Sequence, residues 1–146
     1  MTDRTVIQSV SRTQLVTTTP ESTIFEAACV MTRARSGSVL VLDKSGAATG
    51  IFTERDLLTK VVAKSLDPAA TPVSAVMTRS PITIPPETKV CDAIVLMKER
   101  RFRHLPIADA SGKVLAMFSF RDASSRELID ADDLAEQYDG VTDVLA

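Results

Sequence analysis

Hydrophobic residues recur along this chain in two patterns, and the two patterns alternate in the same order twice. In two stretches they fall at i, i+3, i+4 and i+7, which is the spacing of one face of an α-helix. These positions are Ile24, Ala27, Ala28 and Met31 in the first stretch, and Val90, Ala93, Ile94 and Met97 in the second. Each stretch precedes two short apolar runs separated by Asp-x-Ser-Gly, which predicts a β-hairpin. The turn glycines, Gly46 and Gly112, are expected to take the positive φ of a tight reversal.

Each half of the chain is therefore predicted to form strand, helix, strand, strand and helix. The first strands are short, over 14–18 and 81–84. Ser22 and Thr88 each follow a Pro-Glu pair that ends the strand, and they are candidate N-caps of the helices. In the first half, the apolar residues of 57–64 predict the second helix.

The doubled pattern is a sequence repeat. Residues 15–56 align with residues 81–122 without a gap, at an offset of 66. Thr53 and Ser119 keep a hydroxyl across the offset. The identical pairs are Thr17/Thr83, Pro20/Pro86, Glu21/Glu87, Ala27/Ala93, Met31/Met97, Arg35/Arg101, Asp43/Asp109, Ser45/Ser111, Gly46/Gly112, Phe52/Phe118, Arg55/Arg121 and Asp56/Asp122.

The repeat sets the expected domain organisation. We predict a first repeat over 1–72, a second over 73–128 and an acidic helical tail over 129–146. A repeat of about 60 residues buries little core alone. The two β-α-β-β-α repeats are therefore expected to pack sheet to sheet with pseudo-two-fold symmetry, in a mixed α+β fold.

The net charge is −2, but the distribution is uneven. The stretch from Arg126 onward carries −6, which leaves +4 on residues 1–125. The small total argues against general nucleic-acid binding, while a basic body suits an anionic ligand or self-association. The tail has an apolar stripe that is expected to pack either on its own repeat or on a second copy in a homodimer. The stripe consists of Leu128, Ala131, Ala135 and Tyr138.

Other compositional features indicate the compartment and exclude some chemistry. The N-terminus lacks a signal-peptide pattern, and no apolar run approaches the roughly eighteen residues of a membrane span. Cys29 and Cys91 lie in helical apolar patterns, so we expect reduced core residues in a cytoplasmic protein. The single histidine, His104, has no ligand cluster around it, so no metal site is predicted.

A short polar sequence ends the second strand of each hairpin, as GIFTERD over 50–56 and AMFSFRD over 116–122. A hydroxyl three residues before an acid, at a strand-to-helix junction, is typical of a capping box. On this interpretation Thr53 and Ser119 are N-caps, and the two Asp residues only start a helix.

The same geometry also suits a nucleoside phosphate. A helix N-terminus and a hydroxyl bind phosphate, and an Asp one turn later accepts hydrogen bonds from a ribose diol. Arg55 and Arg121 add a guanidinium for phosphate or an adenine face. Because capping does not require an Arg at the same place in both repeats, this pattern favours the ligand interpretation.

The doubled unit resembles a pair of cystathionine-β-synthase (CBS) domains, known as a Bateman module. The resemblance runs from about residue 5 to residue 128 and includes, in chain order, PESTIFEAACVM, GIFTERD, VMTRSPITI, PETKVCDAIVLM, FRHLPIAD and AMFSFRD. It implies a regulatory adenine-nucleotide ligand in clefts between the repeats, with AMP the first expectation and ATP or an NAD-type dinucleotide as alternatives.

The resemblance also implies roles for individual residues. Thr53 and Ser119 would face phosphate or ribose, Asp56 and Asp122 the ribose diol, and the backbone of two segments the adenine. Together with Arg55, Arg103 and Arg121, which their own chemistry and position suggest, the predicted ligand-binding set is Thr17, Ser38, Val39, Thr53, Arg55, Asp56, Thr83, Arg103, His104, Leu105, Pro106, Ser119, Arg121 and Asp122. Two differences, Gly50 against Ala116 and Leu40 against Pro106, predict that the two sites are not equivalent.

The densest basic run, KERRFRHLPI over 98–107, has two interpretations. A solvated helix end suits Arg100 and Arg101, because cations are favoured at a helix C-terminus. Arg103 and His104 enter the next strand, so they are predicted phosphate contacts of the second site. A nucleic-acid role is disfavoured because only Phe102 nearby offers a stacking surface.

The sequence leaves three candidate functions. The first is a regulatory module without catalytic activity, whose nucleotide changes its conformation and is read by a separate target protein. The second is an enzyme acting on nucleotides, which the sequence disfavours because it shows no P-loop, metal cluster or nucleophile–base pattern. The third is a ligand-free interaction scaffold in which both polar sequences only cap helices.

Overall fold

The computed structural model describes residues 3–10 and 14–145, which divide into two compact units. The first-repeat unit is 14–81, and the second-repeat unit joins 82–146 to the N-terminal segment. These limits differ from the predicted 1–72 and 73–128. Val73 and Met77 belong to the core of the first-repeat unit, while Val6 belongs to the core of the second.

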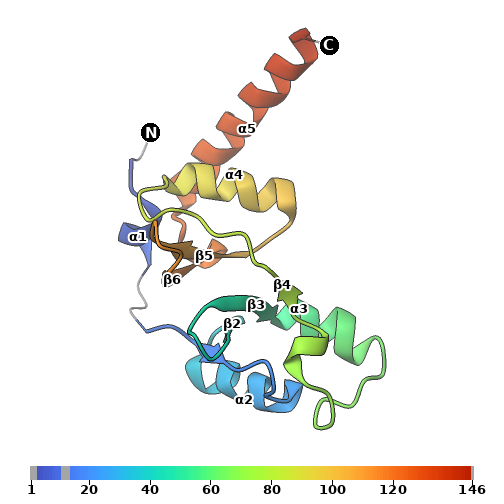
Figure 1. Ribbon diagram of the computed structural model, residues 1–146. Helices are drawn as coiled ribbons and strands as arrows, with labels where there is room; N and C mark the ends of the chain where they lie inside the picture. Colours follow the sequence, from blue (N-terminus) through green and yellow to red (C-terminus); the bar gives the residue numbers. More distant parts are fainter. Residues whose placement is uncertain (1–2, 11–13, 146) are drawn as a thin grey trace. The chain divides into compact units, whose positions relative to one another are not determined.

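The first-repeat unit is built on a four-stranded sheet (Figure 1). The strand order is β1-β2-β3-β4, with β1 parallel to β2 and the other neighbours antiparallel. The strands are β1 Thr17–Thr18, β2 Ser38–Leu42, β3 Ala48–Thr53 and β4 Thr78–Arg79. The helices are α2 Ile24–Ala34, α3 Glu54–Asp56, the π-helix η1 Leu57–Val62 and the 3-10 helix η2 Val73–Ala75. The predicted second helix therefore forms, although most of it is π-helix.

The second-repeat unit has a smaller sheet, the antiparallel hairpin of β5 and β6. Its elements are α1 Val6–Ser9, α4 Val90–Arg100, β5 His104–Ala108, β6 Val114–Ser119, the 3-10 helix η3 Phe120–Asp122 and α5 Ser125–Leu145. The strand predicted over 81–84 does not form; only Ile84 makes a single parallel bridge, to Ile107. This segment carries Pro81 and is followed by two more prolines, which donate no ladder hydrogen bond.

Both hairpin turns have the predicted geometry. Gly46 and Gly112 adopt φ values of 83° and 88°. In each turn one carboxylate oxygen accepts the backbone N–H groups two and four residues later, from Asp43 in the first hairpin and Asp109 in the second. The repeated Asp-x-Ser-Gly therefore encodes the same turn twice.

The helix N-caps lie one residue later than predicted. Thr23, not Ser22, caps α2, and its hydroxyl accepts the Glu26 N–H at 3.1 Å. In the second repeat the N-cap is Lys89, not Thr88, and its side chain makes no capping hydrogen bond. Ser22 and Thr88 instead use their backbone carbonyls to bind the segments described next.

Each unit includes the segment that precedes the other repeat. The Val73 N–H donates to the Ser22 carbonyl at 2.7 Å, and the Val6 N–H donates to the Thr88 carbonyl at 2.8 Å. Because Ser22 and Thr88 are related by the 66-residue offset, the N-terminal segment occupies in the second unit the place that 70–76 occupies in the first. This explains why the compact units and the sequence repeats have different limits.

The predicted apolar helix faces form the cores. Ile24, Ala27 and Met31 are buried in the first unit, with Ala28 half-buried. In the second unit all four predicted positions of α4 are buried. Cys91 is also a core residue, and burial raises the pKa of its thiol. Cys29 is only half-buried, so the core prediction holds for one of the two free cysteines.

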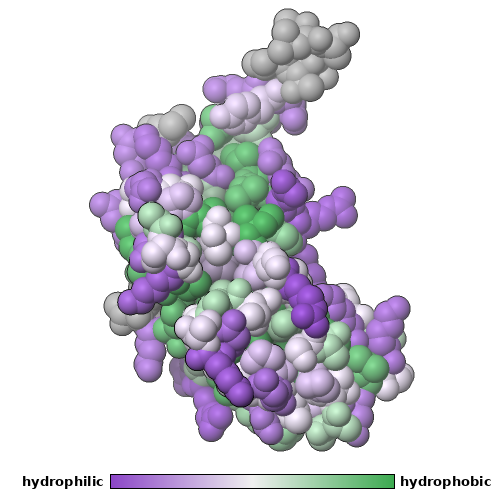
Figure 2. Space-filling model, in the orientation of Figure 1, coloured by the Kyte–Doolittle hydropathy of each residue, from purple (hydrophilic) through white to green (hydrophobic). Residues whose placement is uncertain are grey.

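The acidic tail continues α5 and is not a separate element. Ala131 is buried, and Leu128 and Leu134 pack against the same core as α4. Figure 2 shows apolar side chains gathered where α5 passes α4. Leu128 and Ala131 of the predicted stripe therefore pack on their own unit, while Tyr138 is exposed. Among the described residues, no helix is long and apolar enough to span a membrane.

Candidate functional site

The two hairpins bring predicted site residues together in the same way. In the first-repeat unit Ser38, at the start of β2, pairs with Thr53, at the end of β3. In the second-repeat unit His104 pairs with Ser119 at the corresponding place. Each hydroxyl therefore lies at a strand end, directly across the ladder from a second predicted residue.

Strand alternation decides which of these side chains share a face. Val39 and Leu105 belong to the hydrophobic cores, so they point toward the helices. Ser38 and His104, one position earlier, are on the opposite face of their sheets. The side chains of Val39 and Leu105 therefore lie in the cores, which leaves only their backbone to face a ligand on the other side.

Thr17 and Thr83, the predicted strand-end threonines, occupy less similar places in the two units than Thr53 and Ser119 do. Thr17 in β1 pairs with Leu40, which shares a sheet face with Ser38. Thr83 is exposed and lies outside any strand, next to Ile84. The Ile84 N–H donates to the Pro106 carbonyl at 3.0 Å, which holds Thr83 close to β5.

Both hydroxyl–Asp pairs form capping boxes. The Thr53 hydroxyl accepts the Asp56 N–H at 3.2 Å, and the Asp56 carboxylate accepts the Thr53 N–H at 3.0 Å. In the second repeat the Asp122 carboxylate accepts the Ser119 N–H at 2.8 Å, and the Ser119 hydroxyl accepts the Arg121 N–H at 3.4 Å. The capping geometry is therefore present in both repeats.

Lys60 distinguishes the first-repeat box from the second. Its ammonium lies 3.2 Å from Asp56 Oδ1 and also donates to the Val76 carbonyl at 3.1 Å. Asp56 is buried, and its other oxygen holds the Thr53 N–H. Arg126 stands at the same offset in the second repeat, but its Nε lies 3.2 Å from Asp130 Oδ1.

The chain leaves the second box by a different route. After η3 it becomes extended at Ala123, whereas Asp56 leads directly into η1. A further capping box then starts α5: the Ser124 N–H donates to Glu127 Oε1 at 2.9 Å, and the Ser124 hydroxyl accepts the Glu127 N–H at 3.2 Å. Sequence analysis missed this box, although Ser-Ser-Arg-Glu over 124–127 has its pattern.

The predicted cationic residues are mostly exposed. The guanidinium of Arg103 lies over the Phe120 ring, 4.8 Å from its centroid, in cation–π geometry. Arg55 and Arg121 are exposed in the first turn after their hydroxyl residues. Arg101 ends α4 in the left-handed region, and Lys98 forms an ion pair with Asp132 of α5.

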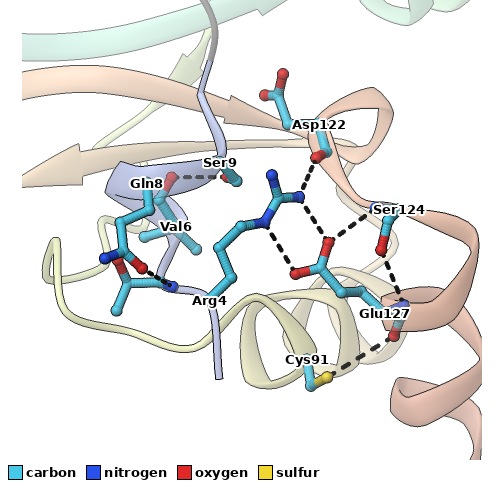
Figure 3. Close-up of polar contacts among 9 residues, drawn as sticks. Arg4, Val6, Gln8, Ser9, Cys91, Asp122, Ser124 and Glu127 are labelled. Carbon is cyan, nitrogen blue, oxygen red and sulfur yellow. Dashed lines mark hydrogen bonds and ion pairs between the residues drawn. The ribbon is translucent and has the colours of Figure 1, made fainter. Parts of the chain in front are cut away.

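An ion pair between Arg4 and Glu127 adjoins the second box (Figure 3). Arg4 Nη2 lies 2.6 Å from Glu127 Oε1, its Nε lies 3.2 Å from Oε2, and Nη2 also donates to the Asp122 carbonyl at 2.9 Å. Burial raises the pKa of the Glu127 carboxyl, but hydrogen bonds from Arg4 and Ser124 outweigh this and hold the pKa below its ordinary range. No sequence pattern indicated that Arg4 reaches the second repeat.

Gly50 has a packing role in the first-repeat unit. A Cβ at this position would lie 2.4 Å from Met77 Sδ and 2.8 Å from its Cγ. Met77 precedes β4, which pairs with β3 at Gly50. Ala116 occupies the matching position in β6, which among the described residues pairs only with β5. The Gly–Ala difference is thus explained by Met77.

The described residues contain no group of three or more His, Cys, Asp or Glu side chains placed to hold a metal ion. What both repeats offer instead is a hydroxyl, a carboxylate and a nearby guanidinium at a strand-to-helix turn. Groups of these three kinds can bind a sugar phosphate.

Comparison with known proteins identifies the class. The sequence profile described as CBS domain matches twice, over residues 7–63 and 73–127. The chain therefore belongs to the CBS domain family, as a tandem pair. It is 41% identical over 101 residues to CBS domain-containing protein CBSCBSPB5 of Arabidopsis thaliana. That match covers 68% of this chain but 18% of the plant protein, so the chain spans about a fifth of this curated relative.

Solved structures share the fold. A CBS-domain containing protein from Agrobacterium tumefaciens matches with a TM-score of 0.76 and 28% identity, over 88% of this chain and 92% of that one. A CBS domain protein from Pyrobaculum aerophilum, complexed with AMP, gives 0.79 and 22%, over 89% and 99%. The CBS domain pair of protein MJ0100, complexed with 5′-methylthioadenosine and S-adenosyl-L-methionine, gives 0.73 and 22%, over 82% and 95%.

Proposed function

We propose that this chain is a regulatory module that binds an adenine nucleotide and signals its bound state to a partner protein. The observation that carries the proposal is the recurrence of one arrangement in both units. A hydroxyl at a strand end faces a residue of the neighbouring strand. An exposed Arg and the Asp of the capping box follow it in the next turn. AMP and S-adenosylmethionine, bound by two proteins of the same fold, share the adenosine that this arrangement suits.

The proposed roles follow from the chemistry of each group. The hydroxyls of Thr53 and Ser119 donate to a phosphate or ribose oxygen, and Asp56 and Asp122 accept from ribose hydroxyls. Arg55, Arg121 and Arg103 supply positive charge for the phosphate. His104 and Ser38, across the ladder from the hydroxyls, border the base together with the backbone of the next residue. Thr17 and Thr83 add a further hydroxyl to each proposed site.

Isothermal titration tests the proposal directly. AMP, ADP, ATP, NAD⁺ and S-adenosylmethionine are titrated separately into the protein after removal of co-purified nucleotide, with GMP as the control. The proposal predicts saturable binding of at least one adenine ligand and weaker binding of GMP. Absence of binding by all five ligands would reject it.

A ligand-free scaffold is the second candidate function. The observation that favours it is that both hydroxyl–Asp pairs already form complete capping boxes without a ligand. The same titration separates the two candidates. Release of a nucleotide product during the titration would instead indicate an enzyme.

We also propose that the module forms a homodimer. Three large apolar side chains on helices of the first-repeat unit, Phe25, Leu58 and Val62, are 58%, 63% and 65% exposed. A second copy of this chain would remove that apolar surface from water. Light scattering of the wild type and of Phe25→Ser measures the molar mass; a wild-type monomer at micromolar concentration would reject the dimer.

A further inference from the structure

The two Asp-containing turns are held in place by different means. In the first repeat the turn continues into η1, and Lys60 connects Asp56 to the Val76 carbonyl. In the second repeat η3 ends at once, because Ala123 is extended. The second turn therefore does not continue directly into a helix, and α5 begins only at Ser125.

Two of the local hydrogen bonds of the second turn are also long. The Ala123 N–H lies 3.4 Å from the Phe120 carbonyl, and the Arg121 N–H lies 3.4 Å from the Ser119 hydroxyl. Both distances exceed the 2.7–3.2 Å range of typical N–H···O hydrogen bonds. By contrast, Arg4 donates to the Asp122 carbonyl at 2.9 Å. Besides the Ser119 N–H, which the Asp122 carboxylate accepts at 2.8 Å, the end of the turn is therefore held by a residue more than a hundred positions away.

Arg4 is itself held in place through both its side chain and its backbone. Its guanidinium binds both oxygens of Glu127, whose side chain is 1% exposed and also accepts the Ser124 N–H. Its carbonyl accepts the Val90 N–H at 3.0 Å, which fixes the N-terminal segment against α4. Figure 3 shows the Asp122 carbonyl directed at Arg4 while the Asp122 carboxylate points away from it. Arg4 can therefore hold the Asp122 backbone without occupying the carboxylate.

Within the part of the chain that the structure describes, the matching positions of the first-repeat unit make a different contact. Thr71 takes the position of Arg4, since its carbonyl accepts the Ile24 N–H at 3.0 Å, but its hydroxyl donates to the nearby Asp67 carbonyl. At the 66-residue offset from Glu127 stands Val61, an apolar core residue. Among the described residues, the Arg4–Glu127 pair therefore has no counterpart at these two positions of the first unit.

We propose that Arg4 is a positioning residue for the second-repeat nucleotide site, through its hydrogen bond to the Asp122 carbonyl. This inference rests on the proposed function and adds a regulatory consequence. Attachment of the N-terminal segment and nucleotide binding at Asp122 stabilise one another, because coupling between two binding events is reciprocal. Any event that detaches residues 3–9 from the second unit weakens nucleotide binding there.

The test compares Arg4→Met with a matched control, Asp3→Asn. Asp3 forms an exposed ion pair with Lys89, at 3.0 Å, so its loss also removes a charged contact of the N-terminal segment but leaves Asp122 untouched. AMP affinity is measured by calorimetry, and exchange of the backbone amides of 119–124 is measured without ligand. Arg4→Met is expected to weaken AMP binding about tenfold, within the usual range of coupling between sites, and to speed this exchange. Asp3→Asn is expected to change both much less, because its ion pair is exposed and contributes little to the attachment of the segment.

The outcomes separate the proposals. If Arg4→Met lowers the melting temperature but leaves AMP affinity and exchange of 119–124 as in Asp3→Asn, Arg4 is only structural and the inference fails. If the wild type binds no adenine ligand, the proposed function fails, and the exchange of 119–124 alone decides whether Arg4 positions the turn. Should Arg4→Met fail to fold, Glu127→Gln is measured instead, with the same expected direction and the same rejecting outcome.

Discussion

Lys60 and Asp56 form an ion pair of 3.2 Å beside the first-repeat capping box, whereas Arg126, at the matching offset, pairs with Asp130. Both oxygens of the buried Asp56 carboxylate therefore have partners within the unit, one in Lys60 and one in the Thr53 N–H. A ribose diol would have to compete with Lys60 there. This gives a structural reason for two non-equivalent sites.

The first prediction is that Asp122→Ala weakens AMP binding more than Asp56→Ala. Loss of the Asp122 acceptor is expected to weaken binding by at least about tenfold, the effect of losing hydrogen bonds to a charged group. Asp56→Ala is expected to change affinity less than about threefold, because Lys60 already engages that carboxylate. Calorimetric titration of both variants measures the difference.

The same two variants should differ in the opposite sense in stability. Asp56→Ala removes a capping acceptor and the carboxylate that pairs with Lys60, so its melting temperature is expected to fall further. An equal loss of AMP affinity in both variants would contradict the assignment of distinct roles.

A second prediction concerns Gly50. Gly50→Ala places a methyl group in contact with the buried Met77 side chain, which has to shift. The expected cost is about 1 kcal/mol of unfolding free energy, at the low end for overpacking because methionine adapts easily. Urea unfolding measures it, and Ala116→Gly in the other hairpin is the comparison. If Gly50→Ala weakened AMP binding without affecting stability, a role in ligand approach would replace the packing role.

Much of the fold could be predicted from the sequence because the local signals agreed with one another. The helix faces of α2 and α4, both Asp-x-Ser-Gly turns and the hairpins appear where the repeat placed them. The positions of the N-terminal segment and of 70–76 could not be predicted in this way. Val6 and Val73 are placed by backbone hydrogen bonds to distant carbonyls, and such bonds leave no pattern in the side chains.

The candidate site was predictable in its polar residues but not in what supports them. The hydroxyl–Asp spacing reveals both capping boxes, because a box spans only four residues. Lys60 resembles any solvent-facing residue of a helix, and Arg4 contacts Asp122 only once the chain has folded. Long-range ion pairs of this kind depend on tertiary structure and have no fixed spacing in the sequence.

A third prediction uses the corrected N-cap of α2. Thr23→Ala removes the hydroxyl that accepts the Glu26 N–H, so it is expected to cost about 1 kcal/mol. Ser22→Ala removes only an exposed hydroxyl hydrogen bond with Thr19 and should cost less than about 0.5 kcal/mol. Urea unfolding of the two variants compares neighbouring positions directly. A larger loss in Ser22→Ala would restore Ser22 as the functional cap.

A fourth prediction concerns acid unfolding. Burial raises the pKa of the Glu127 carboxyl, but the hydrogen bonds from Arg4 and Ser124 outweigh it, so the pKa in the folded protein lies below the ordinary value of 4.5. A carboxyl with a lowered pKa stabilises the fold fully above its unfolded pKa. That stability is lost as the pH falls through the folded pKa. Asp3, Asp43 and Asp109 also have lowered pKa values, through hydrogen bonds from Lys89, Ser45 and Ser111 respectively.

Glu127→Gln isolates this contribution from the others. At pH 7 the variant is expected to be about 1 kcal/mol less stable than the wild type, a modest cost because Arg4 is 39% exposed and solvent screens the pair. The difference should shrink as the pH falls below 4.5, since the wild-type carboxyl then becomes protonated and neutral like the glutamine. Urea unfolding of both proteins from pH 7 to pH 3 measures it, with Asp3→Asn as the control for the exposed pair. A difference that stayed constant over this range would show that Glu127 acts through its shape and not through its charge.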